Sequence, residues 1–145
     1  MMHRVAITGG REVTPSALSL SLALAHLHIL QAGGLLNPNF YLLHGGARGV
    51  DRVAGAYFQD QPGVEVEVYF PDYSGAPGGN RQIAPLLRNK RMVADADLLI
   101  AWPGGSGTAD CVKHAKRKGI PIFYPEGEPI GSNSGASSDL QEAGR

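Results

Sequence analysis

Three short segments place glycines beside arginine, histidine and hydroxyl side chains: TGGR (8–11), HGGARG (44–49) and PGGSGT (103–108). Glycine leaves the main-chain N–H groups open to close approach by an oxyanion. Each segment precedes a stretch that we expect to be helical, and the N-terminus of a helix favours negative charge. Glycine also serves strand-to-helix turns for conformational reasons alone. Three such segments together, two of them with an arginine, nevertheless favour a phosphate or phosphoribosyl site.

The side chains in and beside these segments define the candidate ligand-binding site. Arg48 stands between glycines and offers a bidentate guanidinium to phosphate or carboxylate. Asp51 either meets ligand hydroxyls or Arg48, or caps a helix, and His44 either contacts the ligand or is hydrogen-bonded at a strand end. The candidates from the three segments are Thr8, Gly9, Gly10, Arg11, His44, Gly45, Gly46, Arg48, Gly49, Asp51, Gly104, Gly105, Ser106, Gly107, Thr108 and Asp110.

Known phosphate fingerprints do not describe these segments. The chain has no GxxxxGK[ST] motif, and GSGTAD lacks both the third glycine and the ribose-binding acid of the usual dinucleotide loop. We therefore expect neither an ordinary P-loop nor an ordinary NAD-binding loop.

The elements that must position these segments are strands that alternate with helices. Five apolar, β-rich runs recur along the chain: RVAIT (4–8), FYLLH (40–44), VEVYF (66–70), LLIAW (98–102) and PIFY (121–124). This alternation predicts an α/β fold of the Rossmann-like type, a three-layer sandwich in which a five-stranded parallel sheet carries helices on both faces. In such sheets ligands bind at the carboxyl ends of the strands, where the connections reverse direction.

Capping residues predict the bounds of the first helix. Thr14 is its expected N-cap and Pro15 its first residue, and Gly33 and Gly34 close it. The leucines of this stretch also alternate as in a strand, but alanine and leucine dominate and a strand of that length would be unusual.

The other three helices are expected over about residues 50 to 61, within residues 80 to 94, and after Thr108. Pro85 either starts or breaks the second of these. The last ends with basic residues that suit the helix dipole, and Gly119 stops it.

Composition predicts one domain over residues 1–125, followed by a disordered acidic tail rich in Gly and Ser over residues 126–145. No run approaches the roughly 20 apolar residues of a membrane span, and no signal peptide is evident, so we expect a cytoplasmic protein with no membrane contact. Twelve basic and nine acidic residues precede residue 126, which gives about +3 and suits a small anionic ligand. Neither the histidine spacing nor the single Cys111 indicates a metal site or a disulfide.

The order of motifs resembles a known superfamily. VAITGGR, HGGARGVD, RNKRM (88–92), PGGSGTAD (103–110) and GIPIFY, which together span residues 4–124, are similar to the small YspA/YpsA-related proteins of the SLOG superfamily. More distantly, PGGSGT with its upstream R-x-x-x-M resembles the LOG phosphoribohydrolases, the "lysine decarboxylase-like" proteins. The resemblance implies a Rossmann-like domain that binds nucleotide-derived ligands. We expect no cofactor.

The resemblance also assigns residues. Arg88 falls on the reaction-centre arginine of the LOG pattern. The resemblance therefore makes both Arg88 and the adjacent Asn89 candidate ligand-binding residues. The LOG glutamate falls on Cys111, whose thiol lacks the oxygen geometry of a carboxylate. We expect Cys111 to be a small buried side chain rather than a nucleophile. Asp110, one residue earlier, either lines the site or complements the helix dipole.

Three functions follow from this set of residues. The leading hypothesis is binding of an ADP-ribose-like compound or a nucleoside phosphate, as a sensor or scavenger. The alternative is N-glycosidic cleavage of a nucleoside 5′-monophosphate with Arg88 and Asp110 as catalytic candidates, so the status as an enzyme stays open. Single-stranded nucleic-acid binding is a second alternative, against which the near-neutral charge argues.

Two further expectations concern surfaces. Tyr73 or Trp102 is positioned to stack on a nucleobase, unless the loop that follows the third strand is only a long turn. The leucine-rich first helix carries more apolar surface than one sheet face covers, so we expect a homo-oligomer, a dimer or larger.

Overall fold

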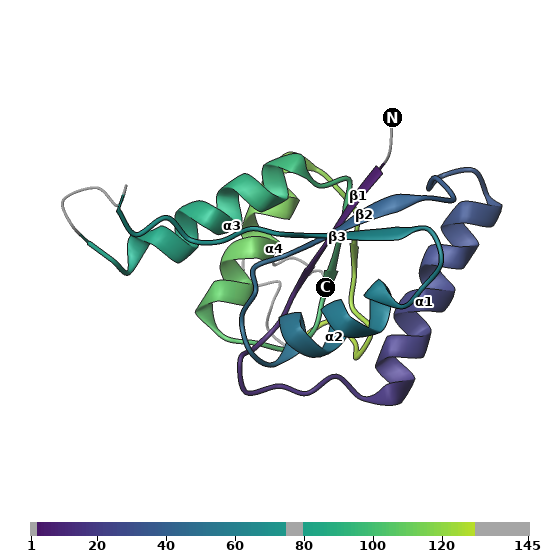
Figure 1. Cartoon of the computed structure of the whole chain (residues 1–145), viewed down its shortest axis with the longest axis horizontal. Helices are drawn as coiled ribbons and strands as arrows, with labels where there is room; N and C mark the ends of the chain where they lie inside the picture. The colour runs from purple at the N-terminus through teal and green to yellow at the C-terminus, as the bar shows by residue number, and fades with distance from the viewer. Residues whose placement is uncertain (1–2, 75–79, 130–145) are drawn as a thin grey trace, which may run out of the picture.

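A five-stranded, fully parallel sheet forms the middle layer of the computed structural model, which describes residues 3–74 and 80–129 (Figure 1). The strand order is β3-β2-β1-β4-β5. The strands are β1 (His3–Thr8), β2 (Phe40–His44), β3 (Val64–Val68), β4 (Leu98–Ala101) and β5 (Ile122–Phe123). Each strand reaches the next through a crossover, as a parallel sheet requires.

Four helices cover the two faces of the sheet: α1 (Ala17–Ala32), α2 (Val50–Gln59), α3 (Ile83–Asp95) and α4 (Ser106–Lys118). The first two lie on one side and the last two on the other (Figure 1). Side chains of β1 alternate accordingly, because Val5 and Ile7 pack with α1 and α2 while Ala6 packs with α3 and α4. The predicted three-layer α/β sandwich is confirmed.

The start of helix α1 differs from the prediction because a different polar side chain caps it. Helix α1 begins at Ala17 with Ser16 as its N-cap, not Thr14, because the Ser16 hydroxyl accepts a 3.0 Å hydrogen bond from the N–H of Ser19. Pro15 therefore precedes the helix instead of opening it. The predicted end is correct, since the helix stops at Gly33.

Helix α4 was expected after Thr108 but begins at Ser106, because the turn after β4 is shorter than the glycine run suggested. It ends as predicted at Gly119, which adopts φ +82. Helix α2 ends at Gln59, close to the expected residue 61. Pro85 lies in the first turn of α3, where a missing N–H costs no helical hydrogen bond.

Strand β3 covers residues 64–68, two residues earlier than predicted. The turn at Gly63 (φ +80) sets this start, because the N–H of Phe40 donates to the Gly63 carbonyl oxygen and aligns Val64 with β2. Tyr69 and Phe70, which the prediction included, follow the strand. The register thus depends on a turn glycine that the apolar pattern did not weigh.

Trp102 belongs to the core and not to a ligand surface. Its side chain is 1% exposed, and its Nε1 donates a 2.9 Å hydrogen bond to the Ser19 hydroxyl of α1. The expectation that Trp102 stacks on a base is therefore wrong. Tyr73 is 39% exposed and lies under the guanidinium of Arg81, 4.4 Å from the ring centroid.

The boundary between domain and tail stays a prediction, because residues 130–145 lie outside the described part of the chain. Across residues 3–74 and 80–129, no helix is long and apolar enough to cross a membrane. Within the same residues, no cluster of three His, Cys, Asp or Glu side chains could hold a metal ion.

Candidate functional site

The topology brings the three glycine segments together at the carboxyl edge of the sheet. Strands β1 and β4 are neighbours, and their following helices lie on opposite faces, which makes the gap between them the switch point of the sheet. The N–H of Gly10 donates a 2.8 Å hydrogen bond to the Pro103 carbonyl, and the Gly10 carbonyl accepts one of 3.2 Å from Val50. Gly10 thus joins the first segment to both others.

Close backbone approach at this junction explains two of the glycines. A Cβ on Gly49 would collide with the carbonyl oxygen of Gly10, and Gly49 also has φ +79. A Cβ on Gly104 would strike the Thr108 hydroxyl and lie 2.7 Å from the Gly10 nitrogen. These two glycines are needed for packing between segments.

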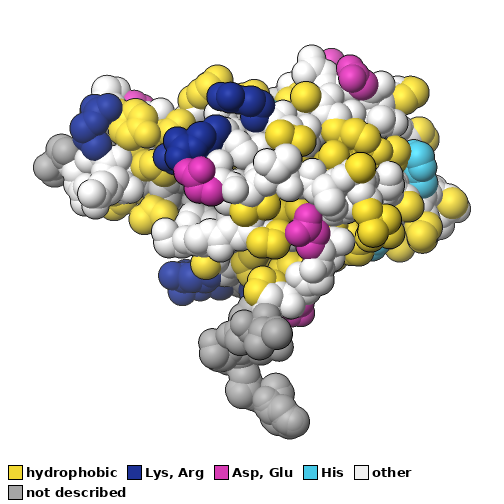
Figure 2. All heavy atoms as spheres, turned by 90° about the horizontal axis from the view of Figure 1, so that it is seen from below, with side chains coloured by type: hydrophobic (Ala, Val, Ile, Leu, Met, Phe, Trp, Pro, Cys, Tyr) yellow, Lys and Arg dark blue, Asp and Glu magenta, His cyan; other side chains and the backbone are white. Residues whose placement is uncertain are grey.

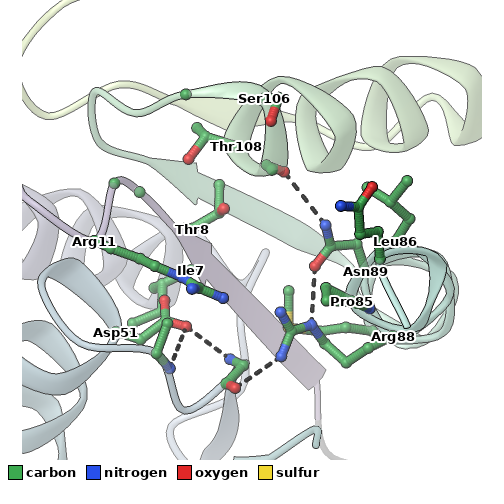
Figure 3. Close-up of a pocket in the computed structure, with 18 residues that line it drawn as sticks. Ile7, Thr8, Arg11, Asp51, Pro85, Leu86, Arg88, Asn89, Ser106 and Thr108 are labelled. Atoms are coloured by element: carbon green, nitrogen blue, oxygen red, sulfur yellow. Dashed lines mark hydrogen bonds between the residues drawn. The ribbon is translucent and has the colours of Figure 1, made fainter. Parts of the chain in front are cut away.

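A cavity of about 400 Å³ opens between the segments and the first half of α3 (Figure 3). Its size is within the usual range for small-molecule sites. Twelve of the predicted residues line it: Thr8, Gly9, Gly10, Arg11, Gly45, Asp51, Arg88, Asn89, Gly105, Ser106, Gly107 and Thr108.

The sequence reasoning missed six lining residues: Ile7, Ala47, Gln82, Pro85, Leu86 and Met92. Gln82 is the N-cap of α3, and Pro85 and Leu86 belong to its first turn. Only the amphipathic pattern of α3 could have indicated that one turn of this helix faces the strand ends. Met92 is the methionine of the R-x-x-x-M element, and this motif could have indicated its place in the lining.

Six predicted residues do not line the cavity, namely His44, Gly46, Arg48, Gly49, Gly104 and Asp110. The structure places Arg48 on the surface, with its side chain 59% exposed and ion-paired to Glu12. The Nδ1 atom of His44 accepts a 3.0 Å hydrogen bond from the N–H of Gly46, and the ring lines a separate depression beside α2.

The N-terminus of α4 faces the cavity without a cap of its own. No side chain caps the helix at Gly105, and its first internal bond runs from the N–H of Ala109 to the Gly105 carbonyl, at 3.0 Å. The N–H groups of Ser106, Gly107 and Thr108 therefore precede the first helical bond, and all three residues line the cavity. This end of the cavity presents main-chain donors and the positive end of a helix dipole.

The amides of the second segment are occupied by the chain itself. The Asp51 carboxylate accepts hydrogen bonds at its Oδ2 atom from the N–H of Gly45 (3.0 Å) and the N–H of Ala47 (3.2 Å). Asp51 therefore neither caps its own helix nor pairs with Arg48. The segment predicted as a phosphate cradle is closed by an internal carboxylate.

Arg88 lies across the floor of the cavity and is fixed by three hydrogen bonds. Its Nη1 donates to the carbonyl oxygens of Gly45 (2.7 Å) and Tyr69 (3.1 Å), and its Nε donates to Oδ1 of Asn89 (2.9 Å). A Cβ on Gly45 would lie 2.5 Å from Nη1, so glycine is required there. Figure 3 draws the Arg88 bonds to Gly45 and Asn89 and the Asp51 bonds.

Burial shifts the pKa of both charged side chains at the floor of the cavity, Arg88 and Asp51. Loss of solvent lowers the pKa of the Arg88 guanidinium, Asp51 raises it, and the Arg11 cation lowers it again. Burial likewise raises the pKa of the Asp51 carboxyl, against the hydrogen bonds from Ala47 and Gly45 and the nearby His44 and Arg88. An anion bound between Arg11 and Arg88 would relieve the repulsion of the two cations.

The second catalytic candidate, Asp110, and the neighbouring Cys111 do not line the cavity. Asp110 accepts a 3.3 Å hydrogen bond from Nδ2 of Asn89 and lies 3.5 Å from Nε2 of His114. Cys111 is 1% exposed, and burial raises the pKa of its thiol to about 11. The expected role of Cys111 as a small buried side chain is confirmed.

Comparison with known proteins agrees with this architecture. The fold and switch-point cavity define a Rossmann-like α/β protein. The chain is 36% identical over 129 residues to the Gene 61 protein of Mycobacterium phage D29, covering 84% of this chain and 95% of that protein. It belongs to the family of that phage protein.

A solved structure, the structural-genomics target TM1055, shares the fold. It superposes with a TM-score of 0.57 at 19% identity, covering 83% of this chain and 72% of the other. No protein-family model matches the sequence.

Proposed function

We propose that this protein binds a nucleotide-derived ligand, an ADP-ribose-like compound or a nucleoside phosphate, with an anionic phosphate at the N-terminus of α4. The observation that carries the proposal is the uncapped first turn of α4, whose residues Ser106, Gly107 and Thr108 line a cavity of about 400 Å³. The order of sequence motifs supports placing the chain in the SLOG superfamily, whose members bind such ligands. We propose a role as sensor or scavenger.

Charge supports the same assignment. Arg11 and Arg88 both line the cavity, and the Arg11 cation is close enough to lower the pKa of Arg88. Two cations and a helix N-terminus around one hollow form an environment that favours an anion over a neutral guest. The internal bonds of Arg88 make it a fixed wall, whereas Arg11 makes no hydrogen bond to another described side chain.

The test is a thermal-shift and calorimetry panel with ADP-ribose, AMP, NAD, ribose 5-phosphate and inorganic phosphate. A ligand at about a hundred times its dissociation constant stabilises the fold by roughly 2.7 kcal/mol. The decisive variant is Arg11→Ala, which should weaken binding about tenfold or more, as loss of a charged hydrogen bond does.

The matched control is Arg48→Ala. Arg48 belongs to a glycine segment as Arg11 does, but it pairs with Glu12 on the surface, outside the cavity lining. Arg48→Ala should leave the affinity unchanged. The proposal fails if no phosphorylated compound stabilises the protein, or if the two arginine variants weaken binding equally.

Self-association through α1 is part of the proposal. Leu18, Ile29 and Leu35 are 69%, 68% and 72% exposed. Figure 2 shows the hydrophobic side chains gathered over this part of the molecule. A second copy would cover this surface, and light scattering should show a dimer or larger assembly that the double variant Leu18→Glu, Ile29→Glu dissociates. A monomeric wild type would remove self-association from the proposal.

A further inference from the structure

We propose that Asp51 gives the site a fixed orientation, in which its free oxygen accepts a hydrogen bond from a sugar hydroxyl while the phosphate lies at α4. This inference rests on the proposed function and narrows its ligand to phosphorylated ribosyl compounds with free ring hydroxyls. It assigns the second glycine segment the role of hydroxyl recognition, opposite to the phosphate cradle that its sequence suggests.

The two carboxylate oxygens of Asp51 differ in their hydrogen bonds. Oδ2 accepts two hydrogen bonds, from the N–H groups of Gly45 and Ala47. Oδ1 makes no hydrogen bond to any described residue. Among the side-chain atoms of the described residues that are sealed from solvent, only the Tyr124 hydroxyl lacks a hydrogen-bond partner. Because Oδ1 of Asp51 also lacks one and is not in that group, it must be accessible to solvent.

The side chain that carries this free oxygen is largely buried. Asp51 is 7% exposed and lines the cavity of Arg11 and the first turn of α4, as well as the depression beside α2. A carboxylate held this rigidly on one oxygen has little freedom to turn away from a guest. Because Oδ1 is open to solvent in the free protein, a ligand that fills the cavity and excludes water must bring a donor to it, since an acceptor left unpaired on binding is costly.

The Asp51 carboxylate also disfavours a ligand phosphate at the second glycine segment. Oδ2 already takes the amides of Gly45 and Ala47, which removes them as donors for a ligand phosphate. An anion at this end would also face the negative charge of Asp51. Donors that remain in the lining include the first-turn amides of α4 and the guanidinium of Arg11, and these favour the phosphate at the end away from Gly45 and Ala47.

The experiment measures the affinity of the wild-type protein for AMP and for 2′,3′-dideoxy-AMP by calorimetry. The two compounds share base and phosphate and differ only in the ring hydroxyls. AMP should bind at least tenfold more tightly, as expected for a hydrogen bond to a charged group. Because this comparison uses the unaltered chain, it does not depend on whether any variant folds.

Two variants refine the result. Asp51→Asn, checked for folding by circular dichroism, should bring the ratio between the two compounds below about threefold. Asp110→Asn, an acid whose side chain is engaged by Asn89 outside the cavity lining, should keep the wild-type ratio. A preference that survives Asp51→Asn, or disappears with Asp110→Asn, would overturn the assignment.

Failure of the inference differs from failure of the proposed function. Equal affinity for AMP and its dideoxy analogue would overturn the role of Asp51 and leave phosphate binding intact. Absence of binding by both AMP and ribose 5-phosphate would overturn the orientation, together with the nucleoside-phosphate part of the proposed function.

Discussion

The guanidinium of Arg88 donates a 2.7 Å hydrogen bond to the carbonyl oxygen of Gly45. The N–H of the same glycine donates to Asp51, so one residue without a side chain holds the cation and the carboxylate of the cavity floor in place. Because Nη1 would lie 2.5 Å from an added Cβ, a side chain at residue 45 displaces Arg88.

Gly45→Ala should therefore destabilise the fold by about 1–3 kcal/mol, the usual cost of overpacking a buried position. Chemical unfolding gives the free energy directly. Gly105→Ala is the control, because its Cβ meets nothing within 4 Å. If Gly45→Ala matched wild-type stability, the Arg88 bond would not be fixed as described.

Gly107→Ala separates stability from binding. Its Cβ would enter open space, and residue 107 lies in the first turn of α4, where alanine is preferred over glycine by up to about 1 kcal/mol. The variant should thus be at least as stable as wild type, while the added methyl hinders close approach of a phosphate to the amides. Calorimetry with the best phosphate ligand should show weaker binding, and unchanged affinity would contradict a phosphate at this turn.

The fold could be predicted from the sequence because it depends on patterns that are local. Apolar runs that form strands, and glycines such as Gly119 that end helices, act through residues adjacent to them in the sequence. The site could be predicted only in part. Parallel strands place their carboxyl ends at one edge of the sheet, so the location of the site follows from the fold class. The hydrogen-bond partner of each polar side chain depends instead on tertiary contacts that the sequence does not show. Nothing near Arg48 in the sequence indicates that its guanidinium pairs with the carboxylate of Glu12, thirty-six residues away.

The hydrogen-bond partners of Asp51 could not be predicted from the sequence either, although they lie only a few residues away. Its spacing from the glycines fits a cap, a ligand contact or a bond to Arg48, and the structure shows instead that it binds the amides of Gly45 and Ala47. The turn conformation at Gly46, with φ +72, directs these amides toward the carboxylate. Sequence spacing alone does not specify that direction.

His44 should make stability depend on pH below about 6.5, its ordinary pKa. Burial lowers the pKa of His44 in the folded protein, and Arg88 lowers it further against the opposing effect of Asp51. As pH falls below 6.5 the unfolded chain takes up a proton that the folded chain does not, so stability decreases. The slope is at most about 1.4 kcal/mol per pH unit for one proton.

His44→Asn isolates that contribution, because the asparagine oxygen can still accept the bond from the N–H of Gly46. Unfolding free energies between pH 5 and 7 should fall less steeply in this variant than in wild type. His26, whose pKa is also lowered by burial, remains in both proteins and accounts for residual slope. Identical slopes would show that His44 does not titrate differently on folding.

Lys118 joins the end of α4 to the end of α3. Its Nζ donates 2.6 Å hydrogen bonds to the carbonyl oxygens of Ala94 and Ala96, where α3 terminates without partners of its own. Lys118→Met keeps the aliphatic stem and removes the donor, so we expect a loss of about 1 kcal/mol in unfolding free energy. Lys116→Met is the matched control in the same last turn, because the Lys116 side chain makes no hydrogen bond to α3. Equal stability of the two variants would show that the helix dipole, rather than the bonds to α3, is what Lys118 satisfies.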